Sequence, residues 1–333
     1  MNEMPDAGKF IKSKIDAEIN VEKKEFNPLS CVELLRDFKE KAVLAKGEKL
    51  QFSGVGQNDV YNISKPFSIG GETVLAGRVE AREAWADSHV QFFKNETGIL
   101  VPADGAPTLQ LEDGFATHIG DETIIGGVDV YPNPTPTDPK RIDYRTAFYR
   151  GHDFPSLKKF ALGPENMKDV RLTSLANNKI AAFTRPQGGS NGNGKIGYIE
   201  LDSLDDINAK NLLNAKIIEN QFAPEEWGGA NELHLLPDGQ IGVLGHVAYR
   251  DEQNIRHYYA ISFVYNPKNH QASPLKIIAT RENFPAGPAK TAELVDVIFP
   301  GGLVRHDDGT ATLYAGLSDT EAGSIKISDP FIF

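Results

Sequence analysis

Five acidic residues precede five short hydrophobic segments, and carboxylates placed in this way can do acid–base chemistry. They are Asp59, Asp113, Asp169, Glu232 and Asp296, and they recur roughly every sixty residues. When carboxylates crowd together, burial and like charge raise the pKa of some of them, so that one keeps a proton while another stays ionised. A protonated and an ionised carboxyl group on either side of a sugar can cleave a glycosidic bond. We therefore take the first four acids as candidate catalytic residues.

Polar and aromatic residues near these acids are candidates for binding a substrate. In the segment "GRVEARE", strand alternation places Arg78, Glu80 and Arg82 on one face. An aromatic face, such as that of Tyr61, Trp85 or Trp227, could stack on a sugar ring. The candidate substrate-binding residues are Asn58, Tyr61, Arg78, Glu80, Arg82, Arg171, Trp227, Asn231, His246 and Asp296.

Each of these residues also has a purely structural interpretation. An Asp that precedes a strand often accepts hydrogen bonds from the backbone amides of a turn. Asp296, which is followed by "VIFPGG", suits this interpretation best among the five acids. A single aromatic residue or histidine is likewise more often a structural residue than a ligand contact. It is the convergence of several such residues that favours a functional site.

The acids open five repeats, each of which reads as an acid, a short strand, a tight turn and a longer strand. The turns are Gly70-Gly71, Gly120-Asp121, Asn177-Asn178, Asp238-Gly239 and Asp308-Gly309. Further strand-like segments between the repeats bring the count to about four antiparallel strands per repeat. This pattern predicts an all-β chain, a five-bladed β-propeller whose inner strands bring the acids to one channel mouth.

The N-terminal part of the chain has two predicted roles. The segment Glu48–Phe52 resembles a strand, and we expect it to complete the last blade and so close the ring. Val32–Ala45 has helical spacing and predicts a short helix outside the ring. We therefore divide the chain into an N-terminal extension, 1–46, and a propeller, 47–333, with repeats starting near 59, 113, 169, 232 and 296.

Composition restricts the partners and the location. The 333 residues include 35 Lys and Arg against 46 Asp and Glu, a net charge of −11. This balance argues against nucleic acid or an anionic membrane as the main partner. The single cysteine, Cys31, allows no internal disulfide, and the chain shows neither a signal-peptide pattern nor a membrane-spanning segment. We expect a cytoplasmic protein that binds a small-molecule or oligosaccharide substrate.

Several long motifs resemble the domain-of-unknown-function family 1861. They are "GVGQNDVYNISKPF", "AGRVEARE", "KDVRL", "WGGANELHLL" and "DVIFPGGL" with "LYAGLSD", and the resemblance spans about Lys49 to Phe331. Members of that family are grouped with the five-bladed propeller glycoside hydrolases and phosphorylases. The resemblance therefore implies a carbohydrate-active enzyme.

The resemblance also implies roles for particular acids. In the superfamily a base or nucleophile lies on the first blade, an Asp that tunes the pKa of the acid on the second, and a general acid, usually Glu, on the third. These positions correspond to Asp59, Asp113 and Asp169. The third departs from the usual pattern because it is Asp, whose side chain is shorter by one carbon. Glu232 on the next blade is the alternative general acid.

Water and phosphate are both candidate acceptors of the sugar at this point. Hydrolysis is the main interpretation, and phosphorolysis is the alternative, because Arg78, Arg82, Arg171, Arg185 and His246 could hold phosphate. A carbohydrate-binding propeller without catalysis is a further alternative. No cofactor is required, although carboxylates around a channel could hold a structural Ca²⁺.

Overall fold

Strands make up nearly all of the regular structure, as the sequence predicts. The computed structural model describes residues 28–41, 45–83 and 87–332. The helical elements within these ranges are α2 (Cys31–Lys41), α3 (Ala209–Leu212) and the 3₁₀ helices η1 (Gly189–Asn191), η2 (Leu204–Asp206), η3 (Arg281–Asn283) and η4 (Ala292–Leu294). The predicted all-β class is therefore confirmed. No helix within these ranges is long and apolar enough to cross a membrane.

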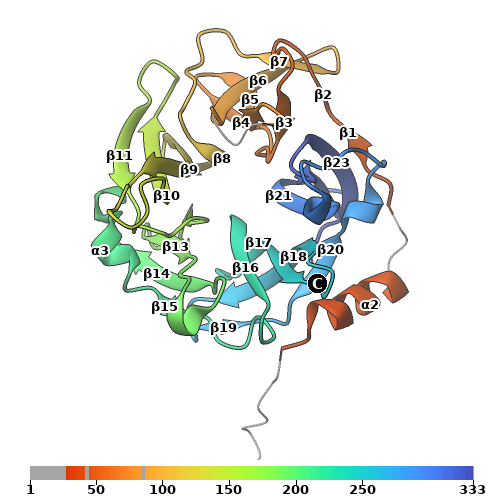
Figure 1. The fold of residues 1–333 in the computed structure, drawn as a ribbon. Helices are drawn as coiled ribbons and strands as arrows, with labels where there is room; N and C mark the ends of the chain where they lie inside the picture. The colour runs from red at the N-terminus through yellow and green to blue at the C-terminus, as the bar shows by residue number, and fades with distance from the viewer. Residues whose placement is uncertain (1–27, 42–44, 84–86, 333) are drawn as a thin grey trace, which may run out of the picture.

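Among the described residues, strand pairing gives sheets of nine, six, four and four strands. The nine-stranded sheet divides where β18 meets β21 in parallel, so five units follow one another around the ring in Figure 1. The first unit contains β2 (Gln51–Phe52), β3 (Asp59–Tyr61), β4 (Phe67–Ile69), β5 (Glu72–Glu80), β6 (His89–Glu96) and β7 (Ile99–Pro102). The second contains β8 (Glu112–Ile119), β9 (Glu122–Pro132), β10 (Ile142–Gly151) and β11 (Lys158–Leu162). The third contains β12 (Arg171–Ser174), β13 (Ile180–Thr184), β14 (Gly197–Leu201) and β15 (Lys216–Ile217).

The last two units complete the ring. The fourth contains β16 (Trp227–Leu235), β17 (Ile241–Arg250), β18 (Arg256–Asn266), β19 (Gln271–Ala272) and β20 (Lys276–Ala279). The fifth contains β21 (Asp296–Arg305), β22 (Thr310–Leu317), β23 (Glu321–Ser328) and the N-terminal β1 (Glu48–Lys49). Four strands, β3, β8, β12 and β21, begin within two residues of Asp59, Asp113, Asp169 and Asp296, whereas Glu232 lies inside β16.

Among the described residues, pairing between strands joins neighbouring units at two junctions. β18 runs parallel to β21, with His257 opposite Asp296, and this contact merges the fourth and fifth units into one nine-stranded sheet. Between the fifth and first units, β1 pairs with β23, whereas β2 pairs in parallel with β7. The predicted strand Glu48–Phe52 thus adds its first half to the last unit, as expected, and its second half to the first unit. The N-terminal segment therefore connects the two ends of the ring.

The five tight turns occur where the sequence predicts them. They connect β4 to β5, β8 to β9, β12 to β13, β16 to β17 and β21 to β22. Asn178 and Gly239 have φ angles of 64° and 82° in these turns, a region that Asn and Gly tolerate. The first repeat differs from the others because its first strand is split into β3 and β4, both of which pair with β5.

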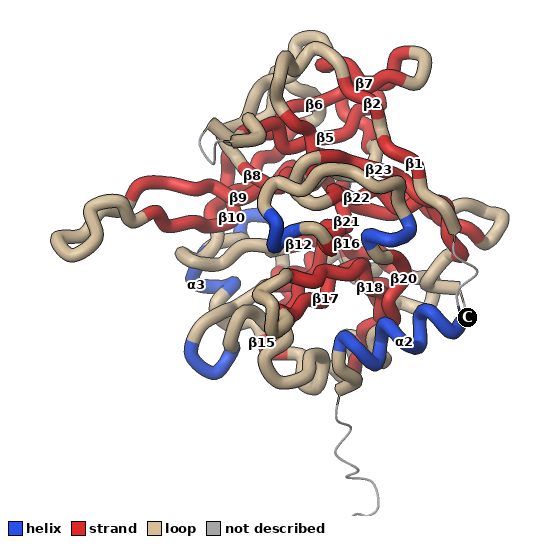
Figure 2. Tube along the Cα trace, turned by 45° about the vertical axis from the view of Figure 1, so that its right-hand side comes forward, coloured by secondary structure: helices blue, strands red, loops and turns tan. Residues whose placement is uncertain are grey.

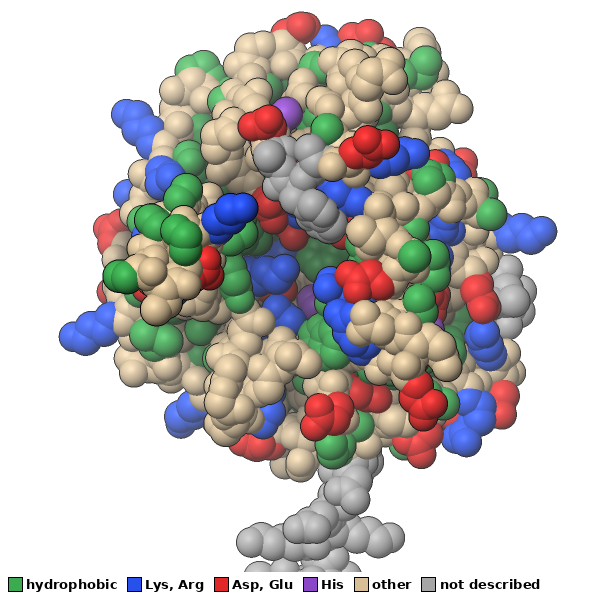
Figure 3. Space-filling view, in the orientation of Figure 1, with side chains coloured by type: hydrophobic (Ala, Val, Ile, Leu, Met, Phe, Trp, Pro, Cys, Tyr) green, Lys and Arg blue, Asp and Glu red, His purple; other side chains and the backbone are tan. Residues whose placement is uncertain are grey.

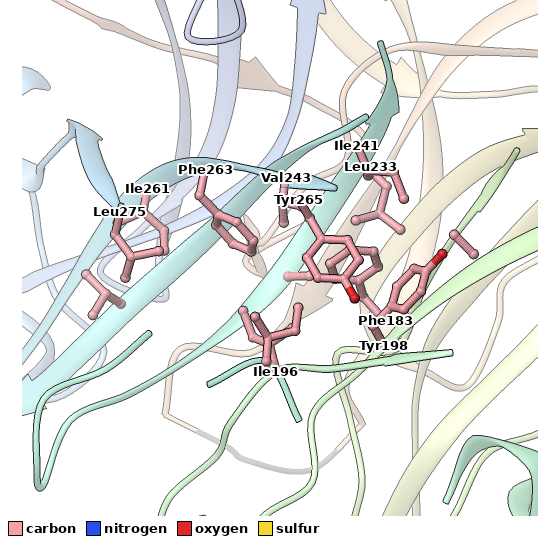
Figure 4. Close-up of a cluster of buried hydrophobic side chains, with 14 of the residues drawn as sticks. Phe183, Ile196, Tyr198, Leu233, Ile241, Val243, Ile261, Phe263, Tyr265 and Leu275 are labelled. Atoms are coloured by element: carbon pink, nitrogen blue, oxygen red, sulfur yellow. The ribbon is translucent and has the colours of Figure 1, made fainter. Parts of the chain in front are cut away.

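Hydrophobic side chains pack between neighbouring units. Figure 4 shows one such cluster, in which Phe183 and Tyr198 of the third unit meet Val243 and Tyr265 of the fourth. Four similar clusters fill the other junctions between units. Sheets that are covered on both faces in this way can contain continuous apolar strands, such as the fully buried β13. The apolar core is thus divided among the junctions between the units.

Helix α2 lies on the outside of the ring (Figure 2). Leu34 and Phe38 pack against the cluster between the third and fourth units, and α2 contacts β20. The backbone amide of Cys31 donates a hydrogen bond of 2.7 Å to Glu226 Oε1, just before β16. Residues 42–44 of the predicted helix Val32–Ala45 lie outside the described residues, as do residues 1–27 of the N-terminal extension.

Candidate active site

The ring face turned to the viewer in Figure 1 is hollowed at its centre. Figure 3 shows that Lys and Arg, Asp and Glu, and His side chains gather in this central hollow. Two other cavities, of about 550 and 1010 Å³, lie at the outer edge beside α2, where Leu29 and Leu34 line both. We place the candidate site in the central hollow because ionisable side chains from several units meet there.

Irregular backbone allows these polar residues to meet. The register of β8 against β9 slips at Asp113, and that of β16 against β17 slips at Asn231. Asp113 and Asp169 also have positive φ angles of 51° and 59°. β-Bulges redirect side chains and are frequent next to active sites, and Asp and Asn tolerate left-handed backbone. Each residue is therefore released from the strict alternation of a strand.

Asp113 accepts two hydrogen bonds from the first unit. Asn62 Nδ2 donates to Asp113 Oδ1 at 2.8 Å, and Arg78 Nη1 donates to the same oxygen at 3.2 Å. The buried Arg78 also contacts Glu112 Oε2 at 3.1 Å and Glu80 Oε1 at 3.2 Å. Because both hydrogen bonds fall on Oδ1, Oδ2 is the Asp113 oxygen that remains for a ligand.

Two further carboxyl groups near Asp113 hold protons more strongly than usual. Burial raises the pKa of Glu112, and Asp113 adds to this effect while Arg78 opposes it. Burial and the neighbouring Asp113 also raise the pKa of Asp319, in the turn between β22 and β23. Crowded, partly desolvated carboxyl groups are the source of protons that the sequence analysis expects. The structure, however, adds Glu112 and Asp319 to this cluster.

A group of cations surrounds Asp169. Arg185 Nη1 lies 3.4 Å from Asp169 Oδ2, and Arg171 Nη2 lies 3.9 Å from Oδ1. Burial opposes ionisation of this carboxylate, but Arg185, Lys168 and Arg171 hold its pKa below the usual range. Asp169 is therefore ionised and cannot donate a proton near neutral pH. It faces three cations, so the cluster carries an excess of positive charge.

His246 lies beside this cationic cluster in its neutral form. Burial lowers the pKa of His246 to about 3, and Arg185 acts in the same direction against Asp169. His246 Nδ1 donates to Asn231 Oδ1 at 2.8 Å, which leaves Nε2 as an acceptor. The ring of Tyr258 stacks on His246 with a centroid distance of 5.6 Å.

Asp59 lies in an ion pair at the rim. Its two oxygens accept hydrogen bonds of 2.9 and 2.6 Å from Arg82 Nε and Nη2. Arg82 is about half exposed, and Asn58 next to Asp59 is exposed. The structure therefore brings Asp113 and Asp169 close to shared cations, while Asp59 faces Arg82.

Glu232 makes a different set of contacts from those expected of a general acid. Lys65 Nζ lies 2.5 Å from Oε1, and Oε2 contacts His234 Nε2 at 2.9 Å and the Leu303 amide at 2.6 Å. Burial raises its pKa, but His234 and Lys65 outweigh burial and lower the pKa to about 2. A carboxylate that stays ionised at neutral pH does not fit the role of proton donor, so we do not retain Glu232 as the general acid.

Asp296 also has a structural environment. Asp296 Oδ2 contacts His257 Nδ1 at 2.6 Å and accepts a hydrogen bond of 2.8 Å from the Tyr259 hydroxyl. These residues lie at the parallel contact between β18 and β21. The structural interpretation, a partner for neighbouring groups, therefore fits Asp296 better than contact with a substrate.

The predicted aromatic platforms are largely covered. Tyr61 is completely buried, and its hydroxyl donates a hydrogen bond to Glu80. Trp227 is 7% exposed, and its Nε1 donates to the Tyr258 hydroxyl at 3.0 Å. Trp85 lies outside the described residues. Among the aromatic residues that the structure describes, these two support their neighbours and do not offer a free face to a sugar.

The structure adds residues to the site that sequence reasoning missed: Asn62, Glu112, Lys168, Tyr258, Lys290 and Asp319. Glu112 and Lys168 directly precede Asp113 and Asp169. Strand alternation would send such neighbours to opposite faces. At the bulge, however, Glu112 and Asp113 both contact Arg78. The sequence shows that Glu112 adjoins Asp113, but only the bulge brings both side chains to Arg78.

The described residues give no support to a structural cation. Within them, no group of three or more His, Cys, Asp and Glu residues could hold a metal ion. Asp113 and Asp169 are instead paired with Arg78, Arg171 and Arg185. The suggested Ca²⁺ site stays a prediction.

Comparison with protein families and solved structures gives a consistent result. The family described as "Protein of unknown function (DUF1861)" matches residues 36–332. The comparison with curated proteins finds no match.

Two solved structures from Leishmania mexicana are similar over nearly the whole chain. The mannose phosphorylase MPT-4, in complex with phosphate ion, is 34% identical, with 90% of this chain and 92% of that chain covered and a TM-score of 0.82. The GDP-Man-dependent mannosyltransferase MPT-1 is 36% identical, with coverage of 91% and 96% and the same TM-score of 0.82. A glycosyl hydrolase from Bacteroides ovatus, 12% identical over 82% of this chain and 84% of that chain, shares the fold with a TM-score of 0.57.

Proposed function

We propose that this chain, which belongs to the DUF1861 family, is a carbohydrate-active enzyme that cleaves a mannoside by transferring its mannosyl group to phosphate. We assign the five strand units as the blades of a five-bladed propeller. The observation that carries the proposal is the excess of positive charge around Asp169, beside the protonatable cluster around Asp113. The similar mannose phosphorylase and mannosyltransferase support mannose as the sugar.

The cationic cluster favours an anionic ligand on physical grounds. Lys168, Arg171 and Arg185 all face Asp169, and Asp113 also acts on Lys168 and Arg171. Buried charges are unfavourable unless they are paired. A phosphate would compensate the excess charge, and the planar fork of an Arg suits its oxygens. The free Nε2 of neutral His246 could accept a hydrogen bond from a protonated phosphate oxygen.

The two clusters can divide the reaction between them. We assign Asp113, which is bonded through Oδ1, as the residue whose Oδ2 transfers a proton to the glycosidic oxygen as that oxygen leaves the anomeric carbon. A phosphate oxygen, held by the cationic cluster, forms the new bond to the anomeric carbon as the old bond breaks. The products are a sugar 1-phosphate and the released sugar. A single displacement of this kind inverts the anomeric configuration.

Phosphate fits this site better than water does. An inverting hydrolase needs a second carboxylate that activates water, in addition to the acid. Asp169 is the ionised carboxylate of the cationic cluster, but Arg171 and Arg185 both lie beside it. Phosphate already carries negative charge and needs no base. Hydrolysis assisted by Asp169 is the competing function, and it predicts turnover without phosphate.

Location and partners follow the sequence analysis as proposals. The single cysteine, Cys31, is buried and unpaired, which suits a reducing compartment such as the cytoplasm. The polar central hollow suits a small-molecule or oligosaccharide substrate. We propose no cofactor, because the protonatable carboxyls and a bound phosphate suffice for the reaction described.

The direct test supplies β- and α-linked manno-disaccharides to the purified protein with and without inorganic phosphate. We expect mannose 1-phosphate to form only when phosphate is present. Asp113→Asn should lower kcat by about 10²–10⁴-fold, the range that general acid catalysis contributes. Thermal melting should show that this variant is folded.

A matched control replaces an exposed acid on the same hairpin. Asp121, in the turn between β8 and β9, has a side chain that is 92% exposed, so Asp121→Asn should keep full activity. Cleavage that is equally fast without phosphate would show a hydrolase. Full activity of Asp113→Asn would overturn the assignment of the proton donor.

A further inference from the structure

Lys290 connects the fifth unit to the first through a buried side chain. It lies between η3 and η4, and its backbone amide donates to the Ser318 carbonyl at 3.0 Å. Its side chain, only 2% exposed, forms an ion pair with Glu80. Its Nζ also lies 3.3 Å from the Tyr61 hydroxyl, which itself donates to Glu80. A buried lysine in this position contacts the predicted binding residues from outside their unit.

Glu80 lies between Lys290 and the Arg78 that holds Asp113. Lys290 and Tyr61 both contact Glu80 Oε2, whereas Arg78 Nη2 binds Oε1 at 3.2 Å. Arg78 Nη1 then reaches Asp113 Oδ1 at 3.2 Å. The contacts therefore form a continuous chain from Lys290 through Glu80 and Arg78 to Asp113.

We propose that Lys290 is a positioning residue, which keeps Glu80 from drawing the Arg78 guanidinium away from Asp113. The inference rests on the proposed function, because it assigns to Asp113 the proton that the reaction uses. Lys290 has no direct contact with substrate in this role. Its effect is transmitted through Glu80 and Arg78.

The geometry of Arg78 explains why Glu80 must be restrained. Arg78 Nε is buried and has no hydrogen-bond partner among the described residues. A carboxylate with both oxygens available prefers two parallel bonds to an Arg fork. Without Lys290, Glu80 could bind both Nε and Nη2 and turn the guanidinium. Nη1 would then leave Asp113 Oδ1 and Glu112, and the proton donor would lose one of its two fixed contacts.

The local charges support the same role. Arg78 is surrounded by the carboxylates of Glu80, Glu112 and Asp113, so a second cation reduces the competition among them. Burial lowers the pKa of Lys290 to about 8, and Arg78 acts in the same direction, while Asp319 and Asp59 oppose both.

The groups that face Lys290 come from three elements. They are Asp59 and Tyr61 on β3, Arg78 and Glu80 on β5, and Asp319 in the turn between β22 and β23. Burial raises the pKa of Tyr61. Burial opposes the charge on Arg78, but Asp113 and Glu112 outweigh burial and raise the pKa of Arg78, so neither group loses a proton near pH 8. Lys290 itself is the group of this set that becomes neutral above about pH 8.

The first test compares Lys290→Met with Lys290→Arg in the phosphorolysis assay. Lys290→Met should lower kcat about 10- to 100-fold and leave the KM for phosphate within about twofold, because a small misplacement of catalytic groups costs rate. Lys290→Arg should keep most of the activity and keep it above pH 8, where the wild type declines. Dividing the kcat of the wild type by that of Lys290→Arg at each pH removes the contribution of phosphate's own ionisation.

A second variant separates positioning from a merely structural role. The double variant Lys290→Met with Glu80→Gln should recover at least about tenfold in kcat, since a neutral amide competes weakly for Arg78. The matched control is Lys49→Met, which removes another lysine of the same junction, paired with Glu321 at 2.8 Å. That control should lower the melting temperature without changing kcat.

A crystal structure of Lys290→Met gives a readout that does not depend on the reaction. Loss of the contact between Arg78 and Asp113 would support the proposal even if the protein proved to cleave no mannoside. An unchanged Arg78, or a double variant as inactive as Lys290→Met, would overturn it. Absence of phosphate-dependent turnover in the wild type would instead reject the proposed function.

Discussion

Replacing Asp169 with Asn tests the charge balance on which the phosphate site depends. Asp169 is 2% exposed and faces Lys168, Arg171 and Arg185. Asn keeps the shape but removes the carboxylate that all three cations face. Removing one partner of a buried ion pair costs about 3–5 kcal/mol, because the other charges remain buried without compensation. We expect a loss of this size in the free energy of unfolding.

The corresponding shift in melting temperature can be estimated from chain length. An unfolding entropy of about 2.1 cal/mol/K per residue gives about 0.7 kcal/mol/K for the 333 residues. The expected decrease in Tm is therefore about 4–7 °C. Since the cations lower the pKa of Asp169, its contribution is present above the usual carboxyl range and is lost as the pH falls. The difference between wild type and variant should shrink in acid.

Phosphate should reverse part of this loss. A ligand at 100 times its Kd stabilises a folded protein by about 2.7 kcal/mol. In Asp169→Asn phosphate would also relieve repulsion among three cations that have lost their shared carboxylate, so its stabilising effect should exceed that in the wild type. Differential scanning calorimetry with and without phosphate measures both effects. Equal stability of the two proteins, or equal stabilisation by phosphate, would refute an unbalanced cationic cluster.

Two further substitutions probe the remaining parts of the site. Burial opposes ionisation of Glu232, yet His234 and Lys65 lower its pKa to about 2, so ionised Glu232 contributes stability that is lost as the pH falls from about 4.3 towards 2. Acid denaturation should show that the free energy of unfolding falls by up to about 3 kcal/mol over this window in the wild type and by much less in Glu232→Gln. The kcat of Glu232→Gln should stay within about threefold of the wild-type value. A loss of activity near that of Asp113→Asn would restore Glu232 as the general acid. In Gly229→Ala the new Cβ would lie 2.8 Å from Arg185 Cδ and 2.9 Å from His246 Cε1. The KM for phosphate should therefore rise at least about tenfold, whereas an unchanged KM would place phosphate elsewhere.

Much of the fold follows from local patterns. The Gly, Asn and Asp pairs predict all five tight turns, because few residues tolerate the dihedral angles of such turns. Alternating and apolar segments predict the strands around them. The split of the first inner strand into β3 and β4 was not visible in this pattern, nor was the division of Glu48–Phe52 between two units. Both depend on pairing with distant strands.

In the candidate site, too, local patterns predict some residues and contacts with distant segments decide the others. Sequence reasoning identified Asp113, Asp169 and the Arg residues around them, because charged residues at strand ends are unusual in a buried core. It also included Asp59, Glu232 and Asp296, whose positions in the repeat look equivalent. The tertiary structure places these three beside Arg82, Lys65 and His257, respectively. Equivalent positions in a repeat have different partners because the segments that face them differ.

By itself, the sequence determined the strand-rich class, the five turns and the presence of paired charges, since these depend on the residue and its near neighbours. Only the tertiary structure decided which carboxyl groups have a raised pKa and which a lowered one. Burial and the placement of Arg78, Arg185 and Lys290 set those proton affinities, and the side chains come from units far apart in the chain. A pKa depends on the charges within a few ångströms, which the order of residues does not specify.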